Sequence, residues 1–459
     1  MKSLVHILAC SLVFFACSNN TEETTSDTES NESMTLASHD EWSRNATIYE
    51  VNLRQHTAEG TINAFAEDIP RINEMGIKIL WLMPVHPIGE LNRKGGMGSY
   101  YSIRDYKAVN PEFGTMDDLK ALVKKAHDLD MKVILDWVAN HTSFDNVWVA
   151  DNQDYYNLDS LGNLQMPEGT DWSDVADLDY DNPELRAAMI DAMQFWLKEA
   201  DVDGFRCDVA GFVPVDFWEA ARDSLETVKS DVFMLAEWED PKHHEKAFDM
   251  SYGWEFLHVM NGISKGEKEL TAIDEYMAKQ DTLFPQEAYR MYFTTNHDEN
   301  SWNGTVMERY GEEGHKTYAV LAYTIAGMPL LYSGQEAGMD YALEFFEKDT
   351  IEWGDYELQE FYTKLLQLNQ SNEALWNGEH GGSFERISTD ADEAVYAYLR
   401  KSGDNAVMVV LNFSDESQSV SFESLPDGEM LSLFGGADFS DLQGGVELAP
   451  LAYHVFHTP

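Results

Sequence analysis

The chain has 459 residues, more than one domain usually holds, so we expect a large domain joined to a smaller one. Hydrophobic residues make up 44% and aromatic residues 12% of the sequence, which excludes a mainly disordered protein. The formal net charge is -51, from 82 acidic and 31 basic residues, so the surface should repel nucleic-acid phosphates. Nucleic acid is therefore disfavoured as a partner, whereas a neutral polysaccharide is compatible with this charge.

The N-terminus is typical of an export signal. Lys2 supplies a positive charge, and residues 4–16 are mostly apolar but too few to form an ordinary membrane span. Residues 1–17 resemble a bacterial lipoprotein signal, which implies that Cys17 carries a lipid and is the only contact with a membrane. Residues 18–40 are acidic and polar with little to bury, so we predict a flexible linker there.

The residues before Cys17 allow a second subcellular destination for the protein. Phe14 and Phe15 depart from the aliphatic and small residues usual at these positions of a lipoprotein signal. We expect an exported protein anchored in the outer membrane, facing the periplasm or the cell surface, with ordinary secretion as the alternative. If the signal is removed before Cys17, the folded part keeps only Cys207, so no disulfide is expected within it.

From about residue 45, short β-branched or aromatic segments alternate with longer helical stretches. This alternation is typical of βα units around a parallel sheet, and eight repeats predict a closed (β/α)8 barrel, also called a TIM barrel. We expect its strands at residues 47–51, 77–82, 132–136, 204–208, 232–237, 247–251, 291–295 and 329–333. We expect its helices at residues 62–75, 116–129, 183–200, 215–229, 265–278, 312–326 and 356–369.

Two segments depart from the alternation. The stretch between the third strand and the next helix is too long for an ordinary βα loop, so we predict a small inserted domain at about residues 142–181. After residue 375 the sequence changes to short alternating runs separated by turns. We therefore predict a barrel domain over residues 41–375 and a C-terminal antiparallel β-sandwich over residues 376–459.

Polar residues gather at the ends of the predicted strands. In a (β/α)8 barrel these ends converge on one rim even when they are far apart in the sequence. Unpaired charges buried there would cost several kcal/mol each, so they must be paired or have a function. The residues are Asp136, Asn140, His141, Arg206, Asp208, Glu237, His297 and Asp298.

Two of these carboxyl groups are expected to differ in charge. Arg206 and Asp208 lie two residues apart on one strand, so their side chains share a face and the cation should keep Asp208 ionised. Glu237 precedes Trp238, and a drier setting raises the pKa of a carboxyl group. A charged and a protonated carboxyl are what a retaining glycosidase needs, with the groups about 5 to 5.5 Å apart.

The polar residues named above lie at the ends of four predicted strands, the third, fourth, fifth and seventh. These four segments resemble the short motifs of the α-amylase family, glycoside hydrolase family 13. Residues 76–84 resemble its second-strand motif, residues 101–106 with 111–114 the segment before the third strand, and residues 175–179 the inserted-domain motif. The resemblance extends over residues 45–335. It implies a retaining glycoside hydrolase that cleaves α-glucosidic bonds in starch-like glucans or maltooligosaccharides by double displacement.

The resemblance also implies a role for particular residues. Asp208 would be the nucleophile, Glu237 the acid and then the base, and Asp298 a stabiliser that binds ring hydroxyls. The residues implied to contact the sugar are Tyr101, by stacking, and His141, Arg206 and His297, by hydrogen bonds. Asn140 and Asp177 match positions that supply oxygen ligands to a structural Ca²⁺, the donor type that this ion prefers.

Departures from the family pattern leave alternatives open. Many members carry a Lys-His pair after the nucleophile, where this chain has Gly211 and Phe212, so the preference for the departing sugar is not predicted. Residues 175–179 match none of the familiar subgroup variants. Transfer to a second sugar and capture of glycans without cleavage are the alternatives, while the linkage, the mode of attack and the oligomeric state are not predicted.

Other polar residues have simpler interpretations. We expect Asp136 to hold Arg206 below the site, and Cys207, on the opposite face of its strand, to be a small buried side chain. His243 and His244 are expected in a solvated turn.

Overall fold

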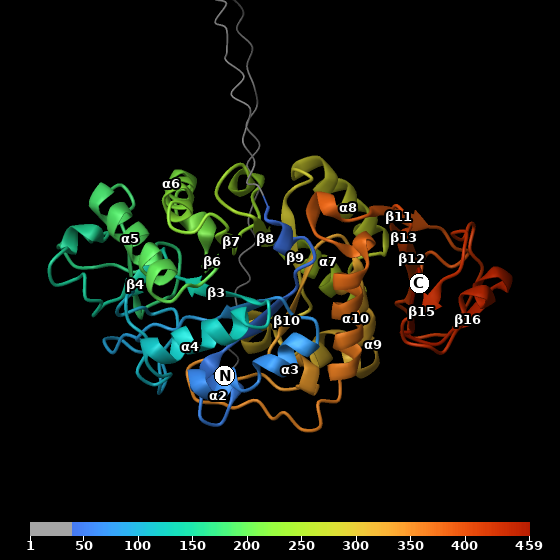
Figure 1. Ribbon diagram of the computed structural model, residues 1–459, viewed down its shortest axis with the longest axis horizontal. Coiled ribbons are helices and arrows are strands. Elements are labelled where there is room, and N and C mark those ends of the chain that lie inside the picture. The colour runs from blue at the N-terminus through green and yellow to red at the C-terminus, as the bar shows by residue number, and fades with distance from the viewer. Residues whose placement is uncertain (1–38) are drawn as a thin grey trace, which may run out of the picture. The chain divides into compact units, whose positions relative to one another are not determined.

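The computed structural model describes residues 39–459, shown in colour in Figure 1. The predicted signal peptide, Cys17 and all but the last two residues of the predicted linker lie outside the described residues. Within residues 39–459, every helix is too short or too polar to cross a bilayer.

Eight parallel strands close into a barrel, which confirms the predicted fold class. Their order around the barrel is β1, β10, β9, β8, β7, β6, β3 and β2, so β1 pairs with β2 on one side and with β10 on the other. Every predicted strand overlaps one of the strands observed. These are β1 (Ile48–Val51), β2 (Ile79–Leu82), β3 (Lys132–Trp137), β6 (Gly204–Cys207), β7 (Phe233–Ala236), β8 (Met250–Tyr252), β9 (Tyr289–Tyr292) and β10 (Met328–Tyr332).

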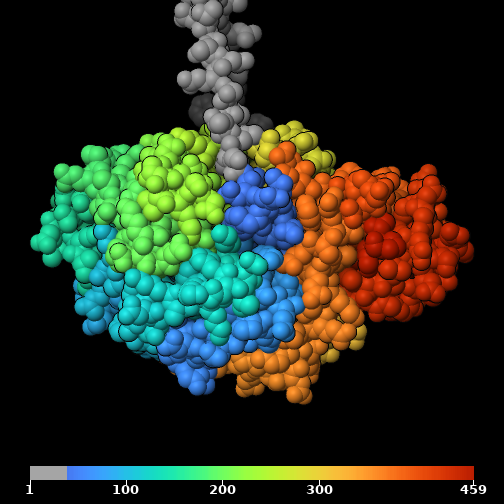
Figure 2. Space-filling view, viewed as in Figure 1, coloured from blue at the N-terminus to red at the C-terminus, as the bar shows by residue number. Residues whose placement is uncertain are grey.

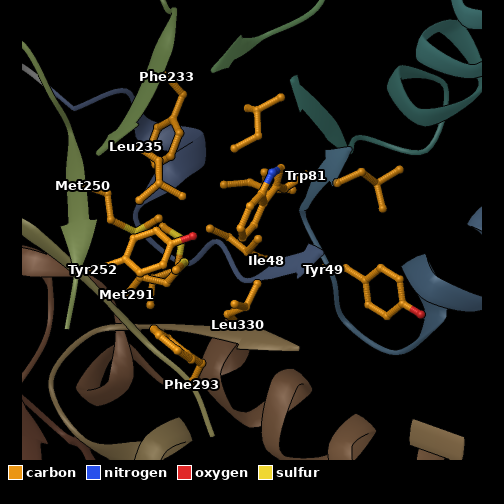
Figure 3. Close-up of a cluster of buried hydrophobic side chains, with 14 of the residues drawn as sticks. Ile48, Tyr49, Trp81, Phe233, Leu235, Met250, Tyr252, Met291, Phe293 and Leu330 are labelled. Carbon is orange, nitrogen blue, oxygen red and sulfur yellow. The ribbon is translucent and has the colours of Figure 1, made fainter. Parts of the chain in front are cut away.

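Large apolar side chains cluster where the barrel strands meet (Figure 3). Ile48 of β1, Trp81 of β2 and Leu235 of β7 contribute to this cluster, and all three are fully buried. Burial of each such side chain stabilises the fold by about 1.5–3 kcal/mol. The packed interior leaves the carboxyl-terminal rim as the place where a barrel of this kind binds ligands.

Ten α-helices accompany the strands within the described residues. They are α1 (Leu53–His56), α2 (Ile62–Ala66), α3 (Ile69–Glu74), α4 (Met116–His127), α5 (Pro183–Glu199), α6 (Val215–Glu226), α7 (Trp254–Ser264), α8 (Thr271–Leu283), α9 (Val306–Thr324) and α10 (Gln359–Ser371).

Two predicted helices were wrong. The segment predicted as one helix over residues 62–75 is two short helices, because Pro70 lacks the N–H that would continue the first helix and instead lies in the first turn of α3. The segment predicted at residues 265–278 contains the turn after α7, which ends at Ser264, and the start of α8. Gly266, with φ +67°, follows α7 and takes the left-handed conformation that ends helices.

The remaining strands lie outside the barrel. Strands β4 (His141–Ser143) and β5 (Val175–Asp177) pair antiparallel within the predicted insertion. Near the C-terminus, a five-stranded antiparallel sheet shares a buried core with a two-stranded sheet, and this region lies beside α9 and α10 in Figure 1. Figure 2 shows the same region in red. Its strands are β11 (Ser383–Ile387), β12 (Val395–Ser402), β13 (Asn405–Asn412), β14 (Gln418–Val420), β15 (Leu431–Ser432), β16 (Val446–Leu448) and β17 (Tyr453–His457).

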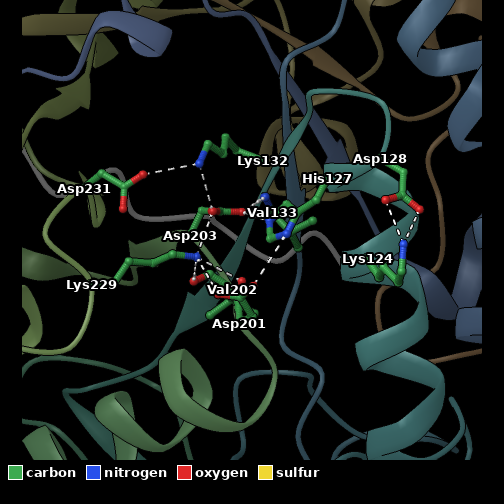
Figure 4. A network of polar contacts seen from close by, with 10 residues as sticks. All are labelled: Lys124, His127, Asp128, Lys132, Val133, Asp201, Val202, Asp203, Lys229 and Asp231. Carbon is green, nitrogen blue, oxygen red and sulfur yellow. Dashed lines mark hydrogen bonds and ion pairs between the residues drawn. The ribbon is translucent and has the colours of Figure 1, made fainter.

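A network of ion pairs occupies the opposite end of the strands from the rim (Figure 4). Asp203, just before β6, is buried and lies 3.2 Å from Lys132 Nζ, 2.9 Å from Lys229 Nζ and 2.7 Å from His127 Nε2. Its carboxylate also accepts a hydrogen bond from the backbone N–H of Val133 on β3. Although burial alone would raise the pKa of Asp203, these partners lower it to about 2.

Replacement of Asp203 should destabilise the barrel in a pH-dependent way. In the folded protein the partners lower the pKa of Asp203 from 3.8 to about 2. Their stabilising effect is therefore present at neutral pH and is lost as the pH falls from 3.8 to about 2. We expect Asp203→Asn to lower the free energy of unfolding by about 3 kcal/mol at neutral pH. Urea denaturation as a function of pH measures this.

The matched control is Asp201→Asn, because Asp201 contacts Lys229 from a side chain that is 71% exposed. Exposed ion pairs contribute little, so its effect should stay below about 1 kcal/mol. Equal losses in the two variants, or a loss for Asp203→Asn that persists in strong acid, would contradict this account.

Candidate active site

The three carboxylates predicted at the rim line one cavity of about 470 Å³. Asp208 directly follows β6, Glu237 directly follows β7, and Asp298 lies in the segment after β9. The carboxyl ends of parallel strands bring the three together. Asp208 and Glu237 are each only 8% exposed, so the solvent that reaches them does so through the cavity.

Arg206 on β6 lies beneath the cavity and joins the carboxylates. Its Nη1 donates to Asp136 Oδ1 at 2.8 Å and to Asp208 Oδ1 at 3.1 Å. Its Nη2 lies 3.0 Å from Glu237 Oε2, which also accepts a hydrogen bond of 2.7 Å from the backbone N–H of Val209. One planar cation therefore contacts both Asp208 and Glu237 and fixes their relative position.

The protonation of this pair differs from the sequence-based expectation. Burial and the charge of Glu237 raise the pKa of Asp208 well above 3.8, against the lowering effect of Arg206. Burial also raises the pKa of Glu237, as predicted, with Arg206 again opposing it. Because each charge disfavours the other, the two groups titrate together, and Arg206 does not bring the pKa of Asp208 down to its ordinary range.

A second cation lies beside Asp298. His297 Nε2 is 3.3 Å from Asp298 Oδ2, and its Nδ1 is 2.5 Å from Glu50 Oε1 on β1. Although burial lowers the pKa of His297, the carboxylates of Asp298 and Glu50 raise it to about 9. His297 is therefore an imidazolium at neutral pH, and it donates from Nδ1 to Glu50 and from Nε2 to the hydroxyl oxygen of Tyr101, at 2.8 Å.

The other residues predicted to contact substrate also reach the cavity. Tyr101 lines it, stacks on the ring of His297 at 5.4 Å and donates a hydrogen bond of 3.0 Å to Asp136. His141 lines the cavity beside Trp172, and burial lowers its pKa to about 3, which keeps the ring neutral. Arg206 is fully buried, so it reaches the cavity through the groups that it holds.

Several residues of the site were missed in the sequence. Glu50, the partner of His297, is a single acidic residue within a fully buried strand, and that burial is the signal that could have identified it. The remaining lining residues come from the insertion and from loops, whose positions no periodic pattern predicts. They include Lys94, Asp171, Trp172, Asp174, Trp302, Phe345 and Phe346.

Aromatic side chains replace the Lys-His pair that many family members have after the nucleophile. A Cβ at Gly211 would lie 1.9 Å from the indole ring of Trp238, so glycine is needed for the ring to pack there. Phe212 packs between Trp238, at 5.7 Å, and Trp172, at 6.2 Å. A cavity of about 330 Å³ lies next to Trp238 and is lined by Glu237 and Trp254.

The two predicted calcium ligands lie together but outside the main cavity. Asp177 on β5 pairs with His141 on β4, the residue after Asn140. Asp177 accepts a hydrogen bond of 2.7 Å from Asn157, and no cationic side chain within residues 39–459 pairs with it. Burial raises its pKa. A half-buried carboxylate beside an amide is chemically suited to a hard cation.

Two simpler expectations held and one was wrong. Asp136 holds Arg206 and accepts from Tyr101, as expected, and Cys207 is fully buried. His243 and His244 are not in a solvated turn, because both are buried. His244 Nε2 lies 2.7 Å from Ser251 Oγ on β8, so tertiary packing covers a segment that looks polar in the sequence.

The sequence matches known families along almost its whole length. Residues 15–386 match the α-amylase catalytic domain, and residues 384–455 match the C-terminal domain of maltogenic amylases. The chain belongs to the α-amylase family of glycosidases. The barrel, the strand-end carboxylates and the C-terminal sheet are thus the parts of an α-amylase-type protein.

Individual relatives agree with this assignment. The chain is 30% identical to a crystallised α-amylase from Lactobacillus plantarum, with a TM-score of 0.81 over 91% of this chain and 100% of that one. It is 32% identical to a noncanonic maltogenic α-amylase from Thermotoga neapolitana, with a TM-score of 0.77 over 90% and 96%. An α-amylase from Haloarcula japonica is 28% identical over 84% of this chain, which spans 58% of that relative.

The charge of His297 should depend on Glu50. In the wild type His297 should lose its proton at about pH 9, and Glu50→Gln removes one of the two carboxylates that raise this pKa. We expect the pKa of His297 to fall by about 1–3 units in the variant. Nuclear magnetic resonance of ¹⁵N-labelled histidine rings measures the shift.

The internal reference is His86, which burial keeps neutral with a pKa of about 3 and which does not contact Glu50. Its signal should be the same in both proteins. An unchanged titration of His297 in Glu50→Gln would show that Glu50 does not set its charge.

Proposed function

We propose that this protein hydrolyses α-glucosidic bonds in starch-like glucans or maltooligosaccharides with retention of configuration. The observation that carries the proposal is the contact of one guanidinium, that of Arg206, with both Asp208 and Glu237 at the edge of an aromatic-lined cavity. A retaining glycosidase needs two carboxyl groups that reach the same glycosidic bond from different sides.

In the first step Asp208 attacks the anomeric carbon. Its Oδ1 accepts from Arg206, while Oδ2 accepts no hydrogen bond within the described residues and is free to form the new bond. As the bond from carbon to the leaving oxygen breaks, Glu237 gives that oxygen its proton. Glu237 Oε2 already accepts from Val209, so the proton belongs on Oε1.

In the second step Glu237 acts as the base. It takes a proton from water, whose oxygen attacks the anomeric carbon and releases Asp208 as a carboxylate. The raised pKa of Glu237 favours its proton at the start of the first step, and once that proton has passed to the leaving oxygen, Glu237 is the carboxylate that the second step needs. Asp298, held by the positive ring of His297, would bind ring hydroxyls of the sugar and favour its distortion.

The cavity wall supports a sugar as substrate. Tyr101, Trp172 and Trp302 present aromatic faces, and Trp302 is 57% exposed although it lines the cavity. The C–H groups of a pyranose pack well on such faces. Two similar solved structures are called an α-amylase and a maltogenic α-amylase, which favours an α-linked glucan.

Transfer to a second sugar is the alternative that a specific observation favours. Glu237 lines both the main cavity and the smaller one beside Trp238 and Trp254. A sugar packed on these indoles would lie next to the acid, where it could leave as product or accept the glycosyl group in place of water. Product analysis with increasing maltose as acceptor distinguishes transfer from hydrolysis.

We also propose a structural Ca²⁺ bound by Asn140 and Asp177. The support is the half-buried Asp177 carboxylate, which lacks a cationic partner within residues 39–459. When bound, the ion would neutralise this charge and fix the insertion to the segment after β3. Metal analysis of the purified protein and of Asp177→Asn tests it, because the variant should bind less calcium.

Substitution of the two carboxyl groups should have different effects on different substrates. Asp208→Asn removes the nucleophile and should lower kcat by about 10⁴-fold or more on maltotetraose and on α-maltosyl fluoride alike. Glu237→Gln removes the acid and should lower kcat on maltotetraose by about 10²–10⁴-fold. The kcat/KM of Glu237→Gln should fall much less on α-maltosyl fluoride, because kcat/KM reports the first step and fluoride leaves without a proton.

The control is Asp201→Asn, whose carboxylate lies at the other end of the barrel and whose activity should equal that of the wild type. Nuclear magnetic resonance of the first product should show the α-anomer. A wild type that binds maltotetraose but leaves it uncut would support glycan capture instead, and a β-anomer would contradict retention.

A further inference from the structure

A cavity of about 480 Å³ lies between the barrel and the C-terminal sheet, away from the candidate active site. Its walls come from α8 and β9 on one side and from β11 and β12 on the other, and Figure 1 shows α8 beside these strands. Gln280, Arg290, Trp376, Phe384 and Arg400 are among its lining residues. None of them lines the cavity that holds Asp208 and Glu237.

Arg400 on β12 is a buried cation that lacks an anionic partner in the described part of the chain. It is 1% exposed, and no ion pair within residues 39–459 includes it. Its Nη2 donates to the backbone oxygen of Gly382 at 3.0 Å, but Nε and Nη1 have no hydrogen-bond partner among the residues that the structure describes. Burial lowers its pKa to about 10. An isolated buried charge of this kind destabilises the fold unless something offsets it.

Arg290, the second arginine that lines the cavity, has the anionic partner that Arg400 lacks within the described residues. Arg290 is also buried, but its guanidinium pairs with Glu239 and donates to Ser251. The acidic residues that line the cavity, Asp281 and Glu379, are exposed and pair with neither arginine. The charge of Arg400 is therefore left for a group that enters the cavity.

A polar side chain and a close backbone approach complete the site. Gln280 of α8 is 7% exposed, and neither its amide nitrogen nor its amide oxygen has a partner within the described residues. A Cβ at Gly381 would lie 3.0 Å from Arg400 Nη2 and 2.2 Å from the carbonyl oxygen of Trp376. Only glycine lets the chain pass so close to the guanidinium.

We propose that this cavity binds a small molecule through a carboxylate or phosphate group held by Arg400 and Gln280. A guanidinium presents two parallel N–H donors that match such oxygens, and the amide of Gln280 supplies a further donor. The cavity is larger than a bare oxoanion, and the rings of Trp376 and Phe384 offer apolar walls for the rest of the molecule. Bound there, the ligand would join α8 of the barrel to β12 of the C-terminal sheet.

Calorimetric titration and thermal unfolding of the intact protein test this proposal. The probes are inorganic phosphate, glucose 6-phosphate, glucuronate and, as the neutral control, glucose, all at constant ionic strength. We expect at least one anion to bind saturably and to raise Tm, because a ligand that binds only the folded state stabilises it. Glucose should do neither. Phosphate and glucuronate distinguish the two kinds of anionic group.

The variants assign the binding to Arg400. Arg400→Met should weaken the anion at least about tenfold, and it should fold, since replacing an unpaired buried charge by an apolar side chain is tolerated. Gln280→Leu keeps the cation and should weaken binding about fivefold. Lys401→Met, at the exposed neighbour of Arg400, is the matched control and should bind as the wild type does.

Three outcomes would overturn the proposal. One is the absence of saturable binding of all three anions to the wild type, which would mean that water alone fills the cavity. Another is equal binding by the wild type and Arg400→Met. If Arg400→Met fails to fold, unchanged affinity in Gln280→Leu would be decisive against the site.

Discussion

The site depends on a single buried cation, Arg206, that contacts three carboxylates. Asp136, Asp208 and Glu237 all lie about 3 Å from its guanidinium, which is fully enclosed by the barrel. Five carboxyl groups of this cluster, Glu50, Asp136, Asp208, Glu237 and Asp298, face only two cations, Arg206 and His297. Burial and the excess of negative charge raise the pKa values of Asp208 and Glu237 above those of free carboxyl groups. The proposed reaction uses this imbalance, because it starts with a proton on Glu237 and a charge on Asp208.

Buried aspartates have opposite pKa shifts at the two ends of the barrel. At the amino-terminal end, Asp203 is surrounded by Lys132, Lys229 and His127, and its pKa is lowered. At the carboxyl-terminal rim, Asp208 shares one arginine with other carboxylates, and its pKa is raised. Cations thus balance the buried carboxylate at the amino-terminal end, where the ion pairs stabilise the barrel. At the rim, where a reaction would use the carboxyl groups, their negative charge is not balanced. Arg400, which pairs with no carboxylate within residues 39–459, is a third imbalance of the opposite sign.

The sequence predicted the features that depend on local pattern. Eight short apolar segments between helical stretches identified the barrel, and polar residues after four of them identified Asp208, Glu237 and Asp298. Features that depend on distant contacts were missed. Glu50 looks like any strand residue until His297 is placed beside it, and His243 and His244 look solvated until the fold covers them. The joint raised pKa of Asp208 and Glu237 likewise arises only when two strands bring the groups together.

The central claim is that Asp208 and Glu237, fixed by Arg206, divide the roles of nucleophile and acid. Mass spectrometry of peptides from protein incubated with 5-fluoro-α-glucosyl fluoride tests it most directly, because the fluorine slows release of the glycosyl group. The account predicts one added sugar per chain, attached to the peptide that contains Asp208. An adduct on Glu237 or Asp298, or turnover that proceeds with no covalent adduct, would contradict it.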